Sequence, residues 1–209
     1  GINFIDTANV YSRGQSEQLL GQSLKDAGLS RNQLVIATKV RGRMGDGRND
    51  VGLSRYHIFQ SVDESLQRLQ MDHIDVLYVH GLDLKTPIEE TMRALNDIVL
   101  TGKVRYIAVC NWPAWMVMKA VGIAEKYGWN KFVGLQYYYS LSSRDIEREV
   151  VPLAIDQSLA IMPWSPLAGG LLSGKYNRNS EKAGDSRSDI FDFPQVYKEK
   201  DNDIIDVIA

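Results

Sequence analysis

A regular alternation of short apolar runs with amphipathic stretches constrains this chain more than any other feature. Six apolar runs of four to six residues recur along the sequence. Their starts lie about 30 residues apart, the length of one strand–helix–strand repeat. The runs are Ile2–Ile5, Leu34–Ala37, Asp75–Val79, Val104–Val109, Phe132–Leu135 and Leu159–Met162. Because they are largely continuous rather than alternating apolar with polar, they indicate parallel strands buried on both faces.

Helix-start signals fall between these runs. Ser54 is a candidate N-cap for one helix, and Ser143 for another. Thr86 and Glu89 have the spacing of a capping box, with Pro87 at the first helical position. The chain therefore alternates strand with helix, which predicts an α/β fold.

Two folds have this alternation: an open doubly wound sheet and a closed barrel. The open sheet usually has a glycine-rich phosphate loop after its first strand, and none follows Ile2–Ile5. The pair Gly169-Gly170 follows the last run instead. We therefore predict a (β/α)8 TIM barrel, in one domain spanning residues 1–209, with about six of its eight strand–helix units present. The apolar run at the very start of the sequence also indicates that a preceding segment is missing.

Composition excludes several classes of protein. The net charge of −2 gives no support for binding nucleic acid. No apolar run approaches the roughly 20 residues that span a bilayer, so no membrane span is expected. The single cysteine, Cys110, excludes an internal disulfide framework and favours a reducing, cytoplasmic location. No cysteine and histidine residues have the spacing of metal ligands, so no metal site is expected.

Chemically active side chains follow the ends of the runs, where a barrel places its active site. They are Asp6 and Tyr11 after the first run, then Lys39, His80, Cys110 with Asn111, Gln136, and Trp164 to Leu167 after the sixth. An ammonium group near a phenol stabilises the phenolate, and a paired carboxylate holds that ammonium in place. A neighbouring histidine can orient a carbonyl oxygen. Such a set suits protonation of an oxygen while hydride arrives at its carbon.

Two other chemistries find little support. Cys110 has no histidine beside it in sequence, so it is a poor candidate for an activated nucleophile. Only one run ends in an acid, whereas glycoside hydrolysis needs two carboxylates.

Several motifs in order resemble the aldo-keto reductases, the branch that includes aryl-alcohol dehydrogenases and channel β-subunits. GINFIDTANVY at residues 1–11 is similar to the family signature, SEQLLG at 16–21 to its following helix, and ATK at 37–39 and DVLYVH at 75–80 to its later motifs. Further matches are VCNW at 109–112, the glutamine at 136, WSPL at 164–167 and GGLLSGKY at 169–176. The resemblance extends from Gly1 to about Tyr176.

The resemblance implies roles residue by residue. Asp6, Tyr11, Lys39 and His80 match the catalytic tetrad, in which the tyrosine donates the proton. Asn111 and Gln136 match residues that bind the nicotinamide carboxamide, and Trp164 matches the aromatic residue that stacks on the ring. Ser165, Pro166, Leu167, Gly169, Gly170, Leu171 and Lys175 match the segment along the cofactor. The implied activity is reduction of an aldehyde or ketone with NADP(H), with NAD(H) left open.

Two residues depart from the family pattern. Cys110 stands where the family usually has serine, and a thiol is the weaker hydrogen-bonding group. Slightly looser carboxamide binding is therefore expected. Tyr138 stands where related sequences often have glutamate, which indicates a different wall near the cofactor.

Two alternatives remain open at this point. The first is a regulatory barrel that binds the cofactor and a membrane channel but turns over slowly. The second is an unrelated barrel, such as an isomerase or lyase, that binds no nicotinamide. The sequence does not identify the carbonyl substrate, the physiological direction of the reaction or the oligomeric state.

Overall fold

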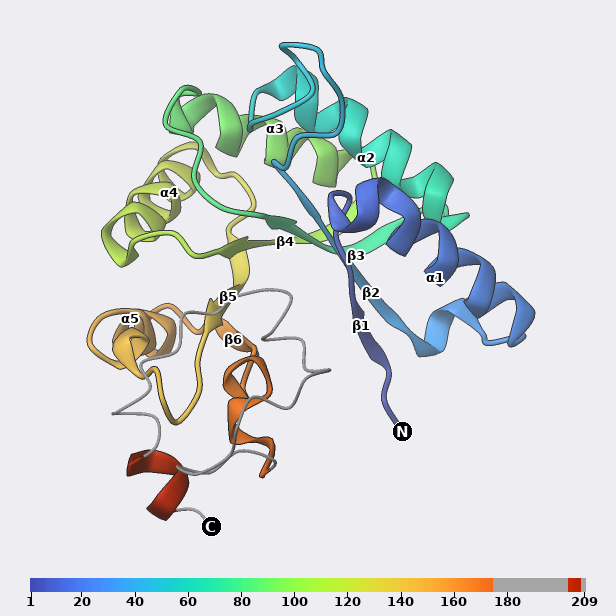
Figure 1. The fold of residues 1–209 in the computed structure, drawn as a ribbon. Helices are drawn as coiled ribbons and strands as arrows, with labels where there is room; N and C mark the ends of the chain where they lie inside the picture. Colours follow the sequence, from blue (N-terminus) through green and yellow to red (C-terminus); the bar gives the residue numbers. More distant parts are fainter. Residues whose placement is uncertain (175–202, 208–209) are drawn as a thin grey trace.

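The computed structural model describes residues 1–174 and 203–207, in which strands and helices alternate (Figure 1). The strands are β1 (Phe4–Asp6), β2 (Val35–Val40), β3 (Ile74–Val79), β4 (Val104–Cys110), β5 (Phe132–Tyr138) and β6 (Ala160–Trp164). The labelled helices are α1 (Gln15–Asp26), α2 (Arg55–Leu69), α3 (Ile88–Leu100), α4 (Ala114–Tyr127) and α5 (Val150–Asp156), and residues 203–207 are also helical. Short 3-10 turns are η1 (Tyr11–Gly14), η2 (Arg31–Gln33), η3 (Asp145–Glu147) and η4 (Ala168–Ser173).

The six strands form one parallel sheet in the order β1-β2-β3-β4-β5-β6. A doubly wound sheet reverses its strand order near the middle, and this sheet does not. The sheet curls, with the helices along its outer side (Figure 1). This arrangement confirms the predicted α/β class as part of a (β/α)8 barrel.

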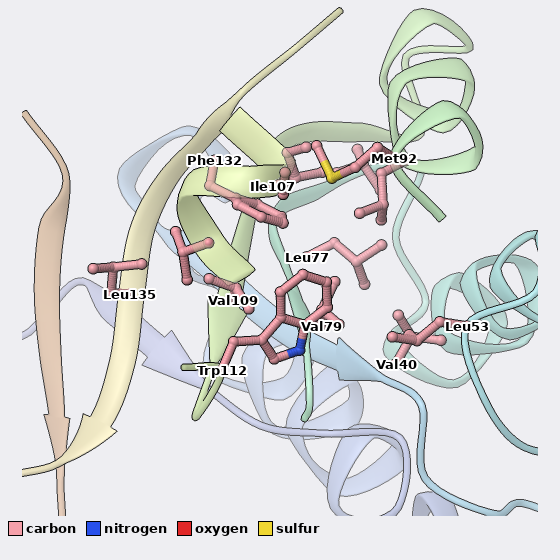
Figure 2. Close-up of a cluster of buried hydrophobic side chains, with 14 of the residues drawn as sticks. Val40, Leu53, Leu77, Val79, Met92, Ile107, Val109, Trp112, Phe132 and Leu135 are labelled. Atoms are coloured by element: carbon pink, nitrogen blue, oxygen red, sulfur yellow. The ribbon is translucent and has the colours of Figure 1, made fainter. Parts of the chain in front are cut away.

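Apolar residues on the two faces of the sheet form two separate clusters. The larger cluster fills the space between the strands and helices, and Figure 2 shows part of it around Leu77, Ile107 and Trp112. The smaller cluster lies on the inner face, where Tyr78 pairs in register with Ala108. Because side chains alternate along a strand, polar residues two positions beyond these inner residues also face inward. Lys39, two positions after Ala37, is placed in this way, and Gln136 is the register partner of the inner residue Cys110.

Some predicted boundaries were wrong. The runs were expected to end before Asp6, Lys39 and Cys110, but all three lie within their strands. A polar side chain does not interrupt the backbone ladder, so the strands continue past the last apolar residue.

The helix starts show one success and two errors. Ser54 caps α2, with its Oγ accepting from the His57 N–H at 3.3 Å. The Thr86 capping box was wrong, because Thr86 Oγ1 donates to Asp83 Oδ2 at 2.7 Å instead. Ser143 does not cap a helix but pairs with Ser140 in a turn. Within the described residues, every helix is too short or too polar to span a bilayer.

Candidate active site

The four side chains predicted to transfer the proton lie together at the carboxyl ends of β1, β2 and β3. Asp6 is the last residue of β1, Lys39 is the penultimate residue of β2, and His80 directly follows β3. Tyr11 begins η1, five residues after Asp6. The strand order makes β1, β2 and β3 neighbours, so residues far apart in sequence meet at one edge of the sheet.

Lys39 is the centre of this group. Its Nζ donates to Asp6 Oδ2 at 2.5 Å, to the Thr7 carbonyl oxygen at 2.7 Å and to Tyr11 Oη at 3.4 Å. The side chain is fully buried, whereas that of Asp6 is 32% exposed. A buried ammonium group is costly unless it is paired and hydrogen-bonded. The three partners meet that requirement and fix the Lys39 head against the Tyr11 hydroxyl.

The segment that carries Tyr11 is tied to β2 and to α1. The Thr7 N–H donates to the Ala37 carbonyl at 2.9 Å, and the Thr7 and Ser16 hydroxyls are 2.8 Å apart. The chain then turns through two left-handed residues into Gly14, whose φ is +91°. Tyr11 remains 40% exposed. The residue is therefore partly accessible while its backbone is held on both sides.

A buried ion pair supports this segment from the helix side. Glu17 is fully buried in α1 and accepts from Arg68 Nε at 2.6 Å and from Thr38 Oγ1 at 2.5 Å. Thr38 directly precedes Lys39 in β2. The SEQLLG motif thus connects α1, α2 and the lysine strand, a role that its sequence alone does not reveal.

His80 meets Tyr11 edge to face, with ring centroids 5.8 Å apart and an interplanar angle of 78°. Burial, together with the positive charges of Lys39 and Arg41, lowers the pKa of His80 to about 4. The imidazole is consequently neutral at pH 7. A neutral histidine next to the Tyr11 ring can donate a hydrogen bond without adding charge to the site.

The predicted cofactor residues lie on β4, β5 and β6. Cys110 ends β4, and Asn111 follows it in the left-handed region with φ +54°. Trp164 ends β6, and its Nε1 donates to Asn111 Oδ1 at 3.1 Å. Gln136 of β5 donates through Nε2 to Asp6 Oδ1 at 3.3 Å. This last bond connects the cofactor residues to the proton-transfer residues.

The Cys110 thiol lies behind Gln136. Burial raises the pKa of Cys110 to about 12, so the group is a protonated thiol. Its Sγ donates to Gln136 Oε1 at 3.7 Å, a long and weak hydrogen bond. Gln136 is consequently held less firmly on this side than a hydroxyl would hold it.

Tyr138 packs against Trp164, whereas the sequence indicated only that it changes the surface near the cofactor. Its ring stacks on Trp164 with centroids 4.9 Å apart and an interplanar angle of 26°. The two residues are register partners at the ends of β5 and β6. One face of the indole is thereby covered by Tyr138, and the ring is braced as one wall of the site.

The segment after β6 has an unusual backbone. Ser165, Ala168, Gly169 and Gly170 all have positive φ, at +48°, +49°, +67° and +103°. The Ala168 and Gly170 N–H groups donate to the Ser165 and Leu167 carbonyls at 2.8 and 2.9 Å, so the segment is a series of tight turns. Pro166 and Leu167 are exposed there, and Leu171 is partly exposed. Lys175 lies outside the described residues.

The donor set on β4 to β6 suits a nicotinamide. Its carboxamide needs one acceptor and one donor, which the Asn111 and Gln136 amides both supply. The Trp164 ring offers an aromatic surface beside them. Among the described residues, no group of three or more histidine, cysteine, aspartate or glutamate side chains is arranged to bind a metal ion.

Comparison with known proteins decides the family. A model of the Aldo/keto reductase family matches residues 1–208. The chain belongs to the aldo/keto reductase family. This match removes the unrelated barrel, isomerase or lyase, from the alternatives.

Relatives within the family have different names. The chain is 43% identical over 190 residues to versiconal hemiacetal acetate reductase of Aspergillus parasiticus, covering 83% of this chain and 55% of that protein. It is 40% identical over 181 residues to the probable voltage-gated potassium channel subunit beta of Arabidopsis thaliana, covering 86% and 55%. It is also 40% identical over 216 residues to the uncharacterized oxidoreductase YrpG of Bacillus subtilis, covering 98% and 65%. This aldo/keto reductase chain thus spans between half and two thirds of the length of these relatives.

Proposed function

We propose that the protein reduces an aldehyde or ketone to an alcohol, with NADP(H) as the cofactor. The observation that carries the proposal is the contact of buried Lys39 with both Asp6 and Tyr11, at 2.5 and 3.4 Å. An ammonium group beside a phenol stabilises the phenolate, which suits donation of a proton to a carbonyl oxygen during its reduction. The family match supports an oxidoreductase, and NADP(H) rather than NAD(H) is the expectation from the family resemblance.

Each residue of the tetrad has a defined task in this mechanism. Tyr11 binds the carbonyl oxygen of the substrate and gives it the hydroxyl proton. Lys39 stabilises the phenolate that remains, because its ammonium group lies 3.4 Å from that oxygen. Asp6 holds Lys39 and balances its charge. His80, neutral and beside the Tyr11 ring, orients the carbonyl oxygen by donating a hydrogen bond.

The residues on β4 to β6 would hold the cofactor. When bound there, a reduced nicotinamide supplies the hydride. Asn111 and Gln136 would orient its carboxamide, and Trp164 would pack on its ring. The Ser165–Leu167 and Gly169–Leu171 segments would lie along its phosphates. These contacts would bring the nicotinamide toward the proton-transfer residues, since Gln136 donates to Asp6, which in turn accepts from Lys39.

The test compares Tyr11→Phe with the unchanged protein. We expect the rate of aldehyde reduction to fall by about 10²- to 10⁴-fold, the usual contribution of a general acid. The dissociation constant of NADPH, followed by tryptophan fluorescence, should stay within a few-fold. Tyr56→Phe is the matched control, since Tyr56 is 61% exposed on α2, away from the site. A near-normal rate in Tyr11→Phe would sink the assignment.

A regulatory subunit of a membrane channel is the second candidate. It is favoured by the 40% identity to plant proteins named as potassium channel β subunits. Such a protein would bind NADPH with similar affinity but turn over aldehydes slowly. Tight NADPH binding without measurable turnover, together with a channel that co-purifies with the protein, would support this candidate over the reductase.

A further inference from the structure

Arg41 has a backbone conformation that side chains rarely adopt. It directly follows β2, two residues after Lys39, and its φ is +134°. A non-glycine residue in this region is strained, and such strain persists only where the surroundings impose it. The Gly52 N–H holds it there by donating to the Arg41 carbonyl at 3.0 Å. Strain of this kind concentrates at active sites and ligand clamps.

The Arg41 side chain is directed to the loop that carries His80. Its Nε donates to the Leu82 carbonyl at 2.9 Å. It also passes Gly81, where an added Cβ would lie 3.9 Å from both Cδ and Nε of Arg41. The guanidinium is near enough to His80 for its charge to act on that ring. Arg41 therefore stands at the rim of the candidate active site, beside His80.

Within the described residues, neither Nη nitrogen of Arg41 has a hydrogen-bond or ion-pair partner. Arg31, Arg55, Arg68 and Arg144 form ion pairs with carboxylates, and Arg41 does not. Its one side-chain hydrogen bond uses Nε, which leaves both Nη nitrogens available. Asp83, the acid of the neighbouring loop, is already used by the backbone of Leu53 and Lys85 and by Thr86.

We propose that Arg41 determines substrate specificity by binding a carboxylate group of the substrate, so that the enzyme prefers carbonyl compounds that carry such a group. The proposal rests on the proposed reductase function. A guanidinium binds a carboxylate through two parallel N–H groups, and Arg41 has two free nitrogens beside the residue that orients the carbonyl.

The cofactor phosphates are a second possible source of the same anionic chemistry. The residues proposed for the cofactor lie on β4, β5 and β6, whereas Arg41 follows β2 and contacts the loop after β3. Its position therefore favours the substrate. The experiment measures both.

The experiment compares two aldehydes of similar shape, 4-carboxybenzaldehyde and methyl 4-formylbenzoate, with the intact protein. The readout is the ratio of kcat/KM for the acid to kcat/KM for the ester. In Arg41→Met we expect this ratio to fall by about 10-fold or more, through the acid alone, because a charge-assisted pair is lost. Arg48→Met, an exposed arginine of the same loop, should keep the ratio of the unchanged protein.

Four outcomes decide the proposal. An acid-specific loss in Arg41→Met, with partial retention in Arg41→Lys, supports it. An unchanged ratio in Arg41→Met overturns it while leaving the reductase function standing. An unchanged ratio together with weaker NADPH binding would assign Arg41 to a cofactor phosphate and also overturn it. Failure of the unchanged protein to reduce either aldehyde would overturn the reductase function, and this proposal with it. Because the ester reports on the same active site, a misfolded variant is recognised by loss of both rates.

Discussion

The two halves of the candidate site are built differently. On the β1 to β3 side, a fully buried Lys39 donates to three oxygens, and the strand that carries it is tied to two helices through Glu17. On the β4 to β6 side, the side-chain contacts join neutral groups: an indole–amide bond to exposed Asn111, a weak thiol bond to Gln136 and the stack of Trp164 on Tyr138. Only the Gln136–Asp6 bond, at 3.3 Å, is described between the amides of the second half and the acid of the first.

This difference matches what each half would have to do under the proposed function. Proton transfer depends on donors and charges that are fixed before the substrate arrives, because reorganisation would add to the barrier. A cofactor site must open and close with every exchange of cofactor, so its own hydrogen bonds have to be easily replaced. The Asn111 amide is bonded to Trp164 through one oxygen and can exchange that bond for one to a carboxamide.

The largest effect should come from removing the centre of the rigid half. In Lys39→Met, Asp6 loses its cation and Tyr11 loses the charge that stabilises its phenolate. We expect carbonyl reduction to fall by about 10²- to 10⁴-fold. NADPH affinity, measured by calorimetry, should change by only a few-fold if the two halves are separate.

Lys119→Met is the control for the loss of a lysine, since Lys119 is exposed on α4. If NADPH affinity in Lys39→Met falls by as large a factor as the rate of carbonyl reduction, the two halves are not separate. This result would show that the ion pair with Asp6 organises both halves through Gln136.

A smaller effect is expected from the open half. Trp164→Leu removes the indole bond to Asn111 and the stack on Tyr138. An aromatic pair contributes about 0.5 to 1.5 kcal/mol beyond its buried area, so NADPH should bind about 2- to 13-fold more weakly. The rate at saturating NADPH should change much less. Trp115→Leu, at a position 65% exposed on α4, is the matched control, and equal effects of the two variants on NADPH binding would contradict the role of Trp164.

Sequence reasoning was most successful for features that depend on local pattern. The apolar runs located the six strands of the described residues, and the motif order placed Asp6, Lys39 and His80 at the end of the sheet where they meet. Strand ends were too short, because the ladder of backbone bonds continues through polar residues such as Lys39. The Thr86 capping box failed because Asp83 competes for the threonine hydroxyl.

Features that depend on contacts between distant segments could not be predicted. The Tyr138–Trp164 stack requires the register of β5 on β6, which no single run contains. The φ of Arg41 depends on a bond from Gly52, across a loop whose path the sequence does not specify. The partnership of Glu17 with Thr38 and Arg68 likewise joins three elements. These are the contacts that give each half of the site its stiffness.

The pH dependence of stability sharpens the comparison further. Burial holds the pKa of His80 at about 4 in the folded protein, below its ordinary value of 6.5. Between these two values the unfolded state binds more protons, so this histidine makes the protein less stable as pH falls from 6.5 toward 4, and adds no further loss below 4. Between pH 7 and pH 4.5, the free energy of unfolding should therefore fall less in His80→Gln than in the unchanged protein. We expect the difference to be on the order of 1 kcal/mol, because solvent partly screens a part-exposed group.

Urea unfolding of both proteins at pH 7 and at pH 4.5 measures this contribution. His57, whose pKa is also lowered by burial, contributes with the same sign in both proteins and cancels in the difference. If the free energy of unfolding falls equally in both proteins between pH 7 and pH 4.5, the β1 to β3 side of the site does not hold His80 neutral.

The smallest effect should come from strengthening the open half. Cys110→Ser replaces a thiol 3.7 Å from Gln136 Oε1 with a hydroxyl, which is the stronger donor. A better hydrogen bond contributes about 0.5 to 1 kcal/mol, so Gln136 should be held more firmly and NADPH should bind about 2- to 5-fold more tightly. Calorimetric titration with NADPH measures the change. The double variant Tyr11→Phe, Cys110→Ser should reduce aldehydes at the same rate as Tyr11→Phe alone. If Cys110→Ser leaves NADPH affinity unchanged, the weak thiol bond does not limit how firmly the β4 to β6 side binds the cofactor. The exposure of Asn111 would then be the remaining explanation.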